Sequence, residues 1–485
     1  MKLLIDPAQD VLLLSSPMQL TPLHVALEKD LSVAHIQLLM DGRKRVLMCR
    51  DTNLNTPLHA AFLNGDSDVA VLYALLERTD CSAESIQESL MMTDSLDRTP
   101  LNLAVLAYPS WKRRYMENEW WGLIVHLANM CPGALMVPCS RGKTPLLNAI
   151  HLGSSVGNFF DLTKLIDLDK TVLSVAGSDG VFPLHVMLKT ASWDSHAPYT
   201  IDALRPVLHP RILTLTDRRG LTALHVALMY EYTDNNVLAG LIDAQREVLL
   251  IQDKEGRTPL HIACELKIDN VDTMCLLLDA VDRVQLCRRK TKQEYTPLVS
   301  ALYSGASFQV ILCLLAPLTT RAQKKSILLT KDNIDHTPLH CAIYQHASVN
   351  ILRLLLDPQC DVLTSMNAHG LSPLHVAIEM GVLPLDDLAF LIDPTRTVLT
   401  MQDVDGNTPL HLAMLSIPVG ATAEYAETVE RMLVDFLFQV LEYKNAAGRT
   451  PLETLQYCMD NTELHLHNDG QRAIVQRLLQ LQTPV

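Results

Sequence analysis

Eighteen histidines and eleven cysteines are the residues of this 485-residue chain with the widest chemical range. Histidine can act as a general acid or base or bind a metal ion, and cysteine can act as a nucleophile or a zinc ligand. Eight of the histidines, however, stand at the same place in a recurring tetrapeptide: His24, His59, His185, His225, His261, His340, His375 and His411. This recurrence indicates a structural role, in which a buried imidazole near a helix start bonds to the backbone of the adjacent turn.

Other reactive side chains do not form a known type of site. Cys458, His465 and His467 are the one loose group of candidate metal ligands, but their spacing fits no zinc pattern, so a solvated loop is expected there. The sequence contains no P-loop, no G-x-S-x-G motif and no H-E-x-x-H motif. No catalytic residue, cofactor or metal site is therefore expected, and the chain is not expected to be an enzyme.

The composition indicates a folded chain without a membrane span. Apolar residues make up 48% of the chain and charged residues 19%, which is too apolar for a disordered chain. The uncharged residues 120–140 contain Pro132 and Gly133, which break the segment before it could cross about 30 Å of hydrocarbon. Acids at Asp6 and Asp10 interrupt the apolar run that a signal peptide needs.

The cysteines and the net charge indicate in which compartment the protein is located and which kinds of partner it binds. An odd number of cysteines without a C-x-x-C pair indicates a reducing compartment, so an intracellular, cytoplasmic location is expected, with the nucleus left open. The net charge of −14 disfavours nucleic-acid binding, although Arg288–Lys292 and Arg321–Lys325 are short basic stretches. The expected partners are other proteins, and the expected oligomeric state is a monomer.

The tetrapeptide TPLH, or a close relative of it, recurs at intervals of 35 to 45 residues. We call its first residue the anchor; the anchors are Thr21, Thr56, Thr99, Thr144, Phe182, Thr222, Thr258, Thr296, Thr337, Ser372, Thr408 and Thr450. Leu stands two places after the anchor in all twelve repeats, Pro follows it in eleven and Ala stands five places on in ten. Leu also stands nine places before the anchor in eleven. Such registration predicts a repeat architecture.

Each recurring position has a physical role. Thr or Ser is a helix N-cap, and Pro suits the first helical position because its missing N–H has no helical partner there. Apolar residues such as Leu260 and Ala263 then follow helical spacing and face a partner helix. The preceding D-x-x-G is a turn, and a second apolar helix upstream ends at D-P, as at Asp393-Pro394.

A turn, a helix that opens T-P-L-H-x-A, a loop and a second helix together resemble the ankyrin repeat. The resemblance implies an all-α fold, a solenoid of stacked helix pairs with projecting hairpin-like turns, which is used for protein recognition. The chain departs from the family in its longer period, partly because two or three extra residues precede the turn. It also departs at Phe182, which replaces the capping Thr, at Ala223, which replaces Pro, and at Glu453, which replaces His.

The positions of the anchors divide the chain into three predicted parts. Residues 1–20 are a partial repeat that opens inside a second helix, for which a truncated gene model is the favoured explanation. Residues 21–449 hold eleven repeats, with insertions near 107–122 and 189–206, and residues 450–485 form a degenerate capping repeat. In the first insertion, Trp111 should point outward, whereas one helical face should belong to the core: Met116, Trp120, Leu123, Ile124 and Leu127.

The resemblance also implies which residues line the concave face. These are the two residues inside D-x-x-G, the one before the anchor and those seven and eight past it. In repeats 6 to 10 they include many tyrosines and cations: Arg218, Arg219, Tyr230, Lys254, Arg257, Leu266, Lys292, Tyr295, Tyr303, His336, Tyr344, His369 and Met380. The hypothesis is that an acidic, partly apolar partner docks there. Scattered solvated side chains are the alternative, and Trp111 marks a second candidate binding site.

The expected function is a non-catalytic scaffold that binds partner proteins or peptides along the concave face of the solenoid. The alternative is an adaptor that recruits substrates to an enzyme complex such as a ubiquitin ligase. An adaptor would normally carry a docking box or an extra domain, and no such segment is evident in residues 1–485.

Overall fold

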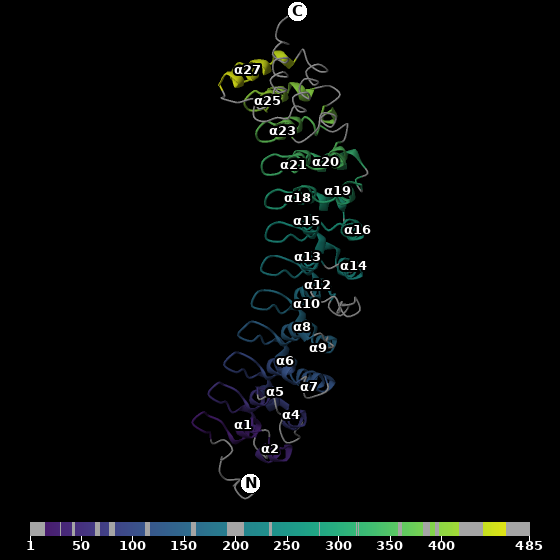
Figure 1. The fold of residues 1–485 in the computed structure, drawn as a ribbon. Coiled ribbons are helices and arrows are strands. Elements are labelled where there is room, and N and C mark those ends of the chain that lie inside the picture. The colour runs from purple at the N-terminus through teal and green to yellow at the C-terminus, as the bar shows by residue number, and fades with distance from the viewer. Residues whose placement is uncertain are drawn as a thin grey trace, which may run out of the picture. The chain divides into compact units, whose positions relative to one another are not determined.

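The computed structural model describes most of the chain, and all regular elements of the described residues are helices (Figure 1). The described residues are 15–29, 31–40, 44–63, 68–76, 83–111, 117–156, 162–191, 208–231, 235–280, 282–316, 318, 320–356, 361–381, 389–392, 397–416 and 440–461. The chain divides into two compact units, Met1–Lys254 and Glu255–Val485, and each is described by itself.

A first helix begins directly after each of the twelve anchors, as the sequence predicted. In the first unit these helices are α1 (Pro22–Glu28), α3 (Pro57–Leu63), α6 (Pro100–Trp111), α8 (Pro145–Val156), α10 (Pro183–Ala191) and α13 (Ala223–Met229). In the second unit they are α15 (Pro259–Glu265), α18 (Pro297–Ser304), α21 (Pro338–Tyr344), α23 (Pro373–Met380), α25 (Pro409–Ser416) and α27 (Pro451–Asn461).

Second helices follow in most repeats. They are α2 (Val33–Met40), α4 (Val69–Leu76), α7 (Glu117–Met130), α9 (Leu162–Leu168), α14 (Asn235–Ala244), α16 (Val271–Asp279), α19 (Phe308–Leu315), α22 (Val349–Leu355) and the short η7 (Ala389–Leu391). Figure 1 shows the turns on the side of the first helices and the second helices on the opposite side, in each unit.

A third, short helix precedes the next turn. These helices are η2 (Lys44–Met48), α5 (Ala83–Met91), η3 (Pro132–Met136), η4 (Lys170–Ser174), α12 (Pro210–Leu213), η6 (Arg246–Leu250), α17 (Arg283–Cys287), α20 (Arg321–Leu328), η8 (Thr397–Thr400) and η9 (Val440–Glu442). The sequence predicted only a few extra residues here. The helix forms because an adjacent apolar pair, such as Val248 and Leu249, becomes fully buried, and its Leu is the one nine places before the anchor.

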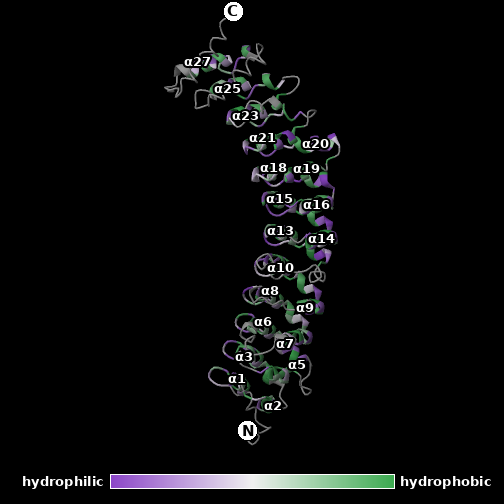
Figure 2. Ribbon diagram, turned by 45° about the vertical axis from the view of Figure 1, so that its right-hand side comes forward, coloured by the Kyte–Doolittle hydropathy of each residue, from purple (hydrophilic) through white to green (hydrophobic). Residues whose placement is uncertain are grey.

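Alanine allows the first helices of neighbouring repeats to pack closely. The alanine five places after the anchor is almost fully buried wherever it occurs, for example Ala263 in α15 and Ala301 in α18. These two helices pack against each other, as do α6 and α8 in the first unit. In Figure 2 hydrophobic stretches alternate with hydrophilic ones along the helices, and hydrophilic stretches recur at the turns and along the outer side of the second helices.

The turns are held by side-chain and backbone hydrogen bonds. Oδ1 of Asp217 accepts hydrogen bonds from two backbone N–H groups of its own turn, both at 2.8 Å. Neighbouring turns are then joined by a backbone bond: the N–H of Lys254 donates to the carbonyl of Arg219 at 2.9 Å, and in the second unit Lys292 donates to Glu255 at 2.9 Å. One such bond builds no strand ladder, and the described residues contain no strand.

The first insertion lengthens both helices of its repeat, because α6 has 12 residues and α7 has 14. Trp120 is 1% exposed, its Nε1–H donates to the carbonyl of Ala104 at 3.0 Å, and its ring meets Phe62 edge-on. Leu123, Ile124 and Leu127 are buried beside it, so the predicted core face is confirmed for these four residues.

Several predictions lie outside the described residues or side chains. They concern the partial repeat at residues 1–14, Met116, most of the second insertion at 192–207, the loose group at His465 and His467, and the cap after residue 461. The backbone of Trp111 ends α6, but the direction of its side chain is likewise outside the described part.

Candidate functional site

The recurring histidines link successive repeats. Seven of the eight bond through Nε2 to the carbonyl of the residue that precedes the next anchor; the seven carbonyls belong to Asn55, Arg98, Leu221, Tyr295, Leu371, Asn407 and Arg449, at 2.8 to 3.2 Å. His225, which is also buried, contacts its own anchor Thr222 at 2.8 Å through Nδ1. The predicted structural role of these imidazoles is confirmed.

The hydrogen bonds fix the protonation state of the imidazole. The backbone N–H of Thr337 points at Nδ1 of His340 at 3.3 Å, so Nδ1 is an acceptor and the ring proton sits on Nε2. Nε2–H can then donate to the carbonyl of Leu371. Burial lowers the pKa of His340 to about 3, and the Leu371 hydrogen bond only partly opposes this effect. Burial also lowers the pKa of His24, His59, His185, His375 and His411, so these rings are neutral in the folded chain at neutral pH.

Repeats 3, 12 and 5 each replace part of this arrangement in a different way. Asn102 stands where histidine is usual, and its Nδ2 donates to the carbonyl of Val137 at 3.0 Å. Glu453 stands at the histidine position of the last repeat, where it closes a capping box with Thr450. At Phe182 the capping hydroxyl is missing, and Nδ1 of the buried His185 has no hydrogen-bond partner.

The turns and the last residues of the first helices form what we call the turn-side surface. In the first unit, the predicted contact residues Arg218, Arg219 and Lys254 are exposed at the tips of their turns. Tyr230 is half-buried, and the ammonium group of Lys189 lies 5.4 Å from its ring centre. All four residues therefore belong to this surface.

In the second unit, the turn-side surface carries aromatic rings from successive repeats. Tyr295 and Tyr303 are half-buried, with ring centres 4.9 Å apart, and Tyr344 lies 4.9 Å from the ring of His336. His336 itself was expected on the surface, but it is only 6% exposed, because its ring lies against those of Tyr344 and His340. A partner cannot reach it directly.

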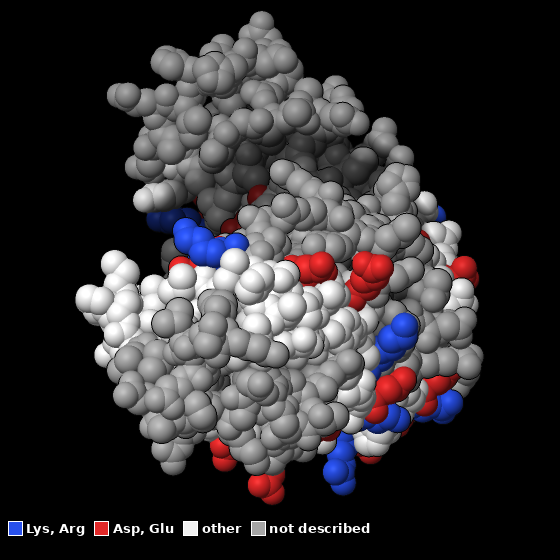
Figure 3. Space-filling view, turned by 90° about the horizontal axis from the view of Figure 1, so that it is seen from below, with Lys and Arg blue, Asp and Glu red and all other residues white. Residues whose placement is uncertain are grey.

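Positive charge on this surface is less concentrated than the sequence suggested. Lys292 is exposed, and Leu266, His369 and Met380 are exposed as well. Other cations, however, are paired with acids of the same surface: Arg257 with Glu265 at 3.1 Å, Lys290 with Glu294 at 3.0 Å and Lys331 with Asp335 at 3.8 Å. On the face drawn in Figure 3, the described Lys and Arg side chains lie beside Asp and Glu and do not gather into one basic area.

A pocket of about 330 Å³ lies on the turn-side surface of repeats 3 and 4, which the sequence analysis did not single out. Its lining includes Leu96 and Leu106, both partly exposed, and the cationic side chains Arg141 and Lys143. Burial and the nearby Lys143 charge lower the pKa of His151 at its edge. The lining residues come from two turns and two helices, and most of them occupy the register positions given above for the concave face: Leu96, Ser140 and Arg141 inside the turns, Arg98 and Lys143 before the anchors, and Leu106, His151 and Leu152 seven or eight places past them.

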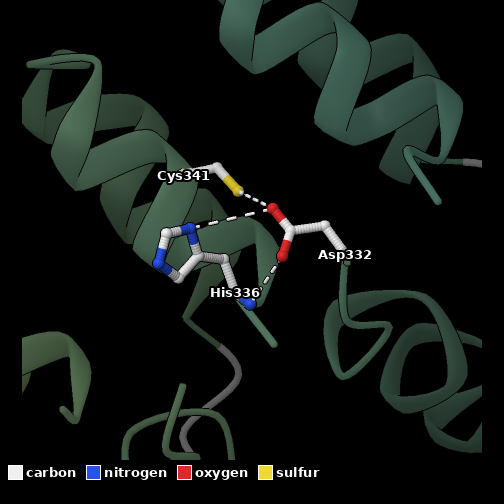
Figure 4. A group of neighbouring side chains, drawn as sticks. All are labelled: Asp332, His336 and Cys341. Atoms are coloured by element: carbon white, nitrogen blue, oxygen red, sulfur yellow. Dashed lines mark hydrogen bonds and ion pairs between the residues drawn. The ribbon is translucent and has the colours of Figure 1, made fainter. Parts of the chain in front are cut away.

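A buried polar cluster lies beneath the tyrosines of the second unit (Figure 4). Asp332 begins a turn, His336 ends it and Cys341 follows in α21. Oδ2 of Asp332 lies 3.7 Å from Nδ1 of His336 and 4.0 Å from Sγ of Cys341, and Tyr303 donates its hydroxyl to the same oxygen at 3.4 Å. The sequence analysis missed this cluster, although the spacing Asp-x-x-x-His-x-x-x-x-Cys was visible.

Comparisons with known proteins agree with the repeat pattern. A family model of ankyrin repeats (3 copies) matches residues 195–286, and a model of the single ankyrin repeat matches residues 335–367. Among similar solved structures is the crystal structure of the ankyrin repeat domain of Bcl-3, titled a unique member of the IkappaB protein family. It is 20% identical, with a TM-score of 0.41, and the alignment covers 52% of this chain and 100% of that one. The search among curated proteins gives no match.

Residues 195–286 and 335–367 are ankyrin repeats, as the T-P-L-H-x-A pattern predicted. Ankyrin repeats are generally protein–protein interaction modules. Within the described residues, no helix has both the length and the apolar character needed to cross a bilayer.

Proposed function

We propose that this chain is a scaffold that binds a partner protein along its turn-side surface, and that the partner presents acidic and apolar side chains. The observation that carries the proposal is the pocket of about 330 Å³ in repeats 3 and 4, which combines cations with leucines. Arg141 and Lys143 can pair with a carboxylate, while Leu96 and Leu106 receive an adjacent apolar side chain.

The tyrosines of the second unit supply a further contact area. Tyr303 and Tyr344 are half-buried and held by neighbouring groups, so a partner can pack on them without ordering flexible side chains. The exposed Lys292 lies in the turn just ahead of α18, which carries Tyr303, so this unit too offers a cation beside aromatic rings.

Affinity purification of the intact chain, followed by mass spectrometry, tests the proposal. Three surface variants separate the candidate contacts: Arg141→Glu with Lys143→Glu, Arg218→Glu with Lys254→Glu, and Tyr303→Ala. Lys324→Glu, which is exposed on α20, is the matched charge-reversal control. Partners should be lost with the pocket variant and kept with the control.

Two outcomes would redirect the proposal. If all three variants keep their partners and Trp111→Ala loses them, the binding site is the insertion rather than the turn-side surface. If the partners include the subunits of a ubiquitin ligase, the adaptor alternative gains support, because a scaffold alone need not recruit such an enzyme.

A further inference from the structure

We propose that Asp332, His336 and Cys341 form a site for one Zn²⁺ ion, with Oδ2, Nδ1 and Sγ as the three ligand atoms (Figure 4). These atoms all lie within 4.8 Å of one another. In tetrahedral zinc sites the ligand atoms are about 2.0–2.3 Å from the ion and so roughly 3.3–3.8 Å apart. Oδ2 is already 3.7 Å from Nδ1 and 4.0 Å from Sγ. Small side-chain movements would therefore complete the coordination.

The cluster contains polar atoms whose bonding is incomplete. Nδ1 of His336 is buried and has no hydrogen-bond partner, and the His336 side chain as a whole is only 8% exposed. Oδ1 of Asp332 accepts backbone N–H groups at 2.8 and 3.0 Å, whereas Oδ2 receives two long contacts, from the Tyr303 hydroxyl at 3.4 Å and from Sγ of Cys341 at 4.0 Å. A buried carboxylate oxygen and a buried imidazole nitrogen that face each other without a good hydrogen bond cost free energy. A bound cation would remove that cost for both.

Other turns of the chain show what the turn itself requires. The residue four places after the turn aspartate often donates to its Oδ2: Asn55 to Asp51 at 2.9 Å, and Asn407 to Asp403 at 3.3 Å. At Asp332 the equivalent residue is His336, whose ring stands off at 3.7 Å. An ordinary turn therefore does not need this histidine.

Cys341 is likewise unusual at its position. The residue four places after the anchor is Val226 in repeat 6 and Val376 in repeat 10, and both are buried. A valine thus fills this buried position in other repeats, so packing alone does not require the thiol of Cys341. His336 and Cys341 thus stand at two positions of one repeat where the other repeats named above carry Asn and Val. Both side chains face the carboxylate of Asp332.

The charges of the three ligands balance the ion. Zinc binding displaces the thiol proton of Cys341, which leaves one carboxylate, one thiolate and one neutral imidazole around Zn²⁺. The net charge of the buried site is then zero. A fourth position remains for a water molecule or for the Tyr303 hydroxyl, and the ion would tie the turn at Asp332 to α21.

Metal analysis of the full-length chain tests this site. After removal of bound metal with a chelator, Zn²⁺ should bind at one equivalent per chain, and Co²⁺ should give a thiolate-to-metal charge-transfer band. His336→Asn and Cys341→Val place residues there that other repeats use, so both variants should keep their helical circular dichroism. Each should lose the band and the bound equivalent. Added Zn²⁺ should raise the unfolding midpoint of the unaltered chain but not of these variants.

Cys264→Ala is the matched control, because Cys264 is a buried cysteine of the same unit outside the cluster. Its Co²⁺ spectrum should equal that of the unaltered chain. The proposal is overturned if Cys341→Val retains one equivalent of Zn²⁺ with an unchanged cobalt spectrum, or if the unaltered, folded chain binds neither metal.

Discussion

Nε2 of His340 lies 3.0 Å from the carbonyl oxygen of Leu371, the residue directly before the next anchor. The bond joins one repeat to the following one across 31 positions of sequence. It requires a neutral imidazole, because Nδ1 accepts the backbone N–H of Thr337. Protonation of His340 therefore removes an acceptor from the helix cap and places a charge in a buried site.

This state of the histidines predicts acid sensitivity. Their pKa is lowered by burial, and that of His340 falls to about 3, so the unfolded chain binds more protons than the folded chain below pH 6.5. Stability is full above the unfolded pKa and falls as the pH drops below it, by up to about 1.4 kcal/mol per pH unit for each such histidine. Urea unfolding midpoints at pH 7.5 and pH 5 measure this loss.

A non-titrating variant isolates the contribution of one ring. His340→Asn introduces the residue type that does the same work at Asn102, so it should fold. Its stability should decrease less between pH 7.5 and pH 5 than that of the unaltered chain. An identical pH dependence in both proteins would show that His340 is not responsible.

A missing cap predicts a stabilising substitution. Nδ1 of His185 is buried without a partner because Phe182 replaces the threonine or serine found at the other anchors. Phe182→Thr should raise the free energy of unfolding by about 1 kcal/mol, since it supplies both an N-cap and a partner for Nδ1. Phe182→Ala is the control that removes the ring without adding a hydroxyl. Equal urea unfolding midpoints for Phe182→Thr and Phe182→Ala would show that the added hydroxyl does not stabilise the helix start.

Two turn glycines have the same backbone angle, but replacing them with alanine should lower the free energy of unfolding by different amounts. Gly406 and Gly448 both have φ of +73°, which strains any other residue by about 1 kcal/mol. A Cβ at Gly406 would lie 2.8 Å from the backbone nitrogen of Ala446 in the next turn, whereas one at Gly448 meets no described atom within 4 Å. Gly406→Ala should therefore destabilise the chain by at least about 1 kcal/mol more than Gly448→Ala in chemical denaturation. Similar losses of unfolding free energy for the two variants would mean that the turn of Gly406 and the turn of Ala446 do not approach each other closely.

A buried amide pair predicts non-additive mutations. Nδ2 of Asn148 donates to Oδ1 of Asn102 at 2.9 Å, and Asn102 in turn donates to Val137 at 3.0 Å. Asn102→Ala leaves both neighbours unsatisfied and should cost about 2–3 kcal/mol. Asn148→Val introduces the residue of Val226 at the equivalent place, and the double variant should lose less stability than the sum of the two single losses. Additive losses, from urea unfolding of all four proteins, would exclude the coupling.

The sequence predicted features that depend on one repeat at a time. The helix starts, the capping anchors and the buried alanines are local patterns, and so all of them could be read from the chain. The third helix was missed because a pair such as Val248 and Leu249 is too short to show helical periodicity. The burial of His336 and the pocket around Lys143 depend on side chains from neighbouring repeats, which no single repeat specifies.

The imidazole links are not continuous along the chain. Val299 and Leu147 stand at the histidine position of repeats 8 and 4, and a hydrocarbon side chain cannot donate to a carbonyl of the following turn. Each marks a boundary without the imidazole link, where only other hydrogen bonds remain, such as Tyr303 to Asp332 and Ser178 to Arg141. Under mechanical load, the second unit should part first between repeats 8 and 9, and the first between repeats 4 and 5, releasing blocks of repeats rather than single ones.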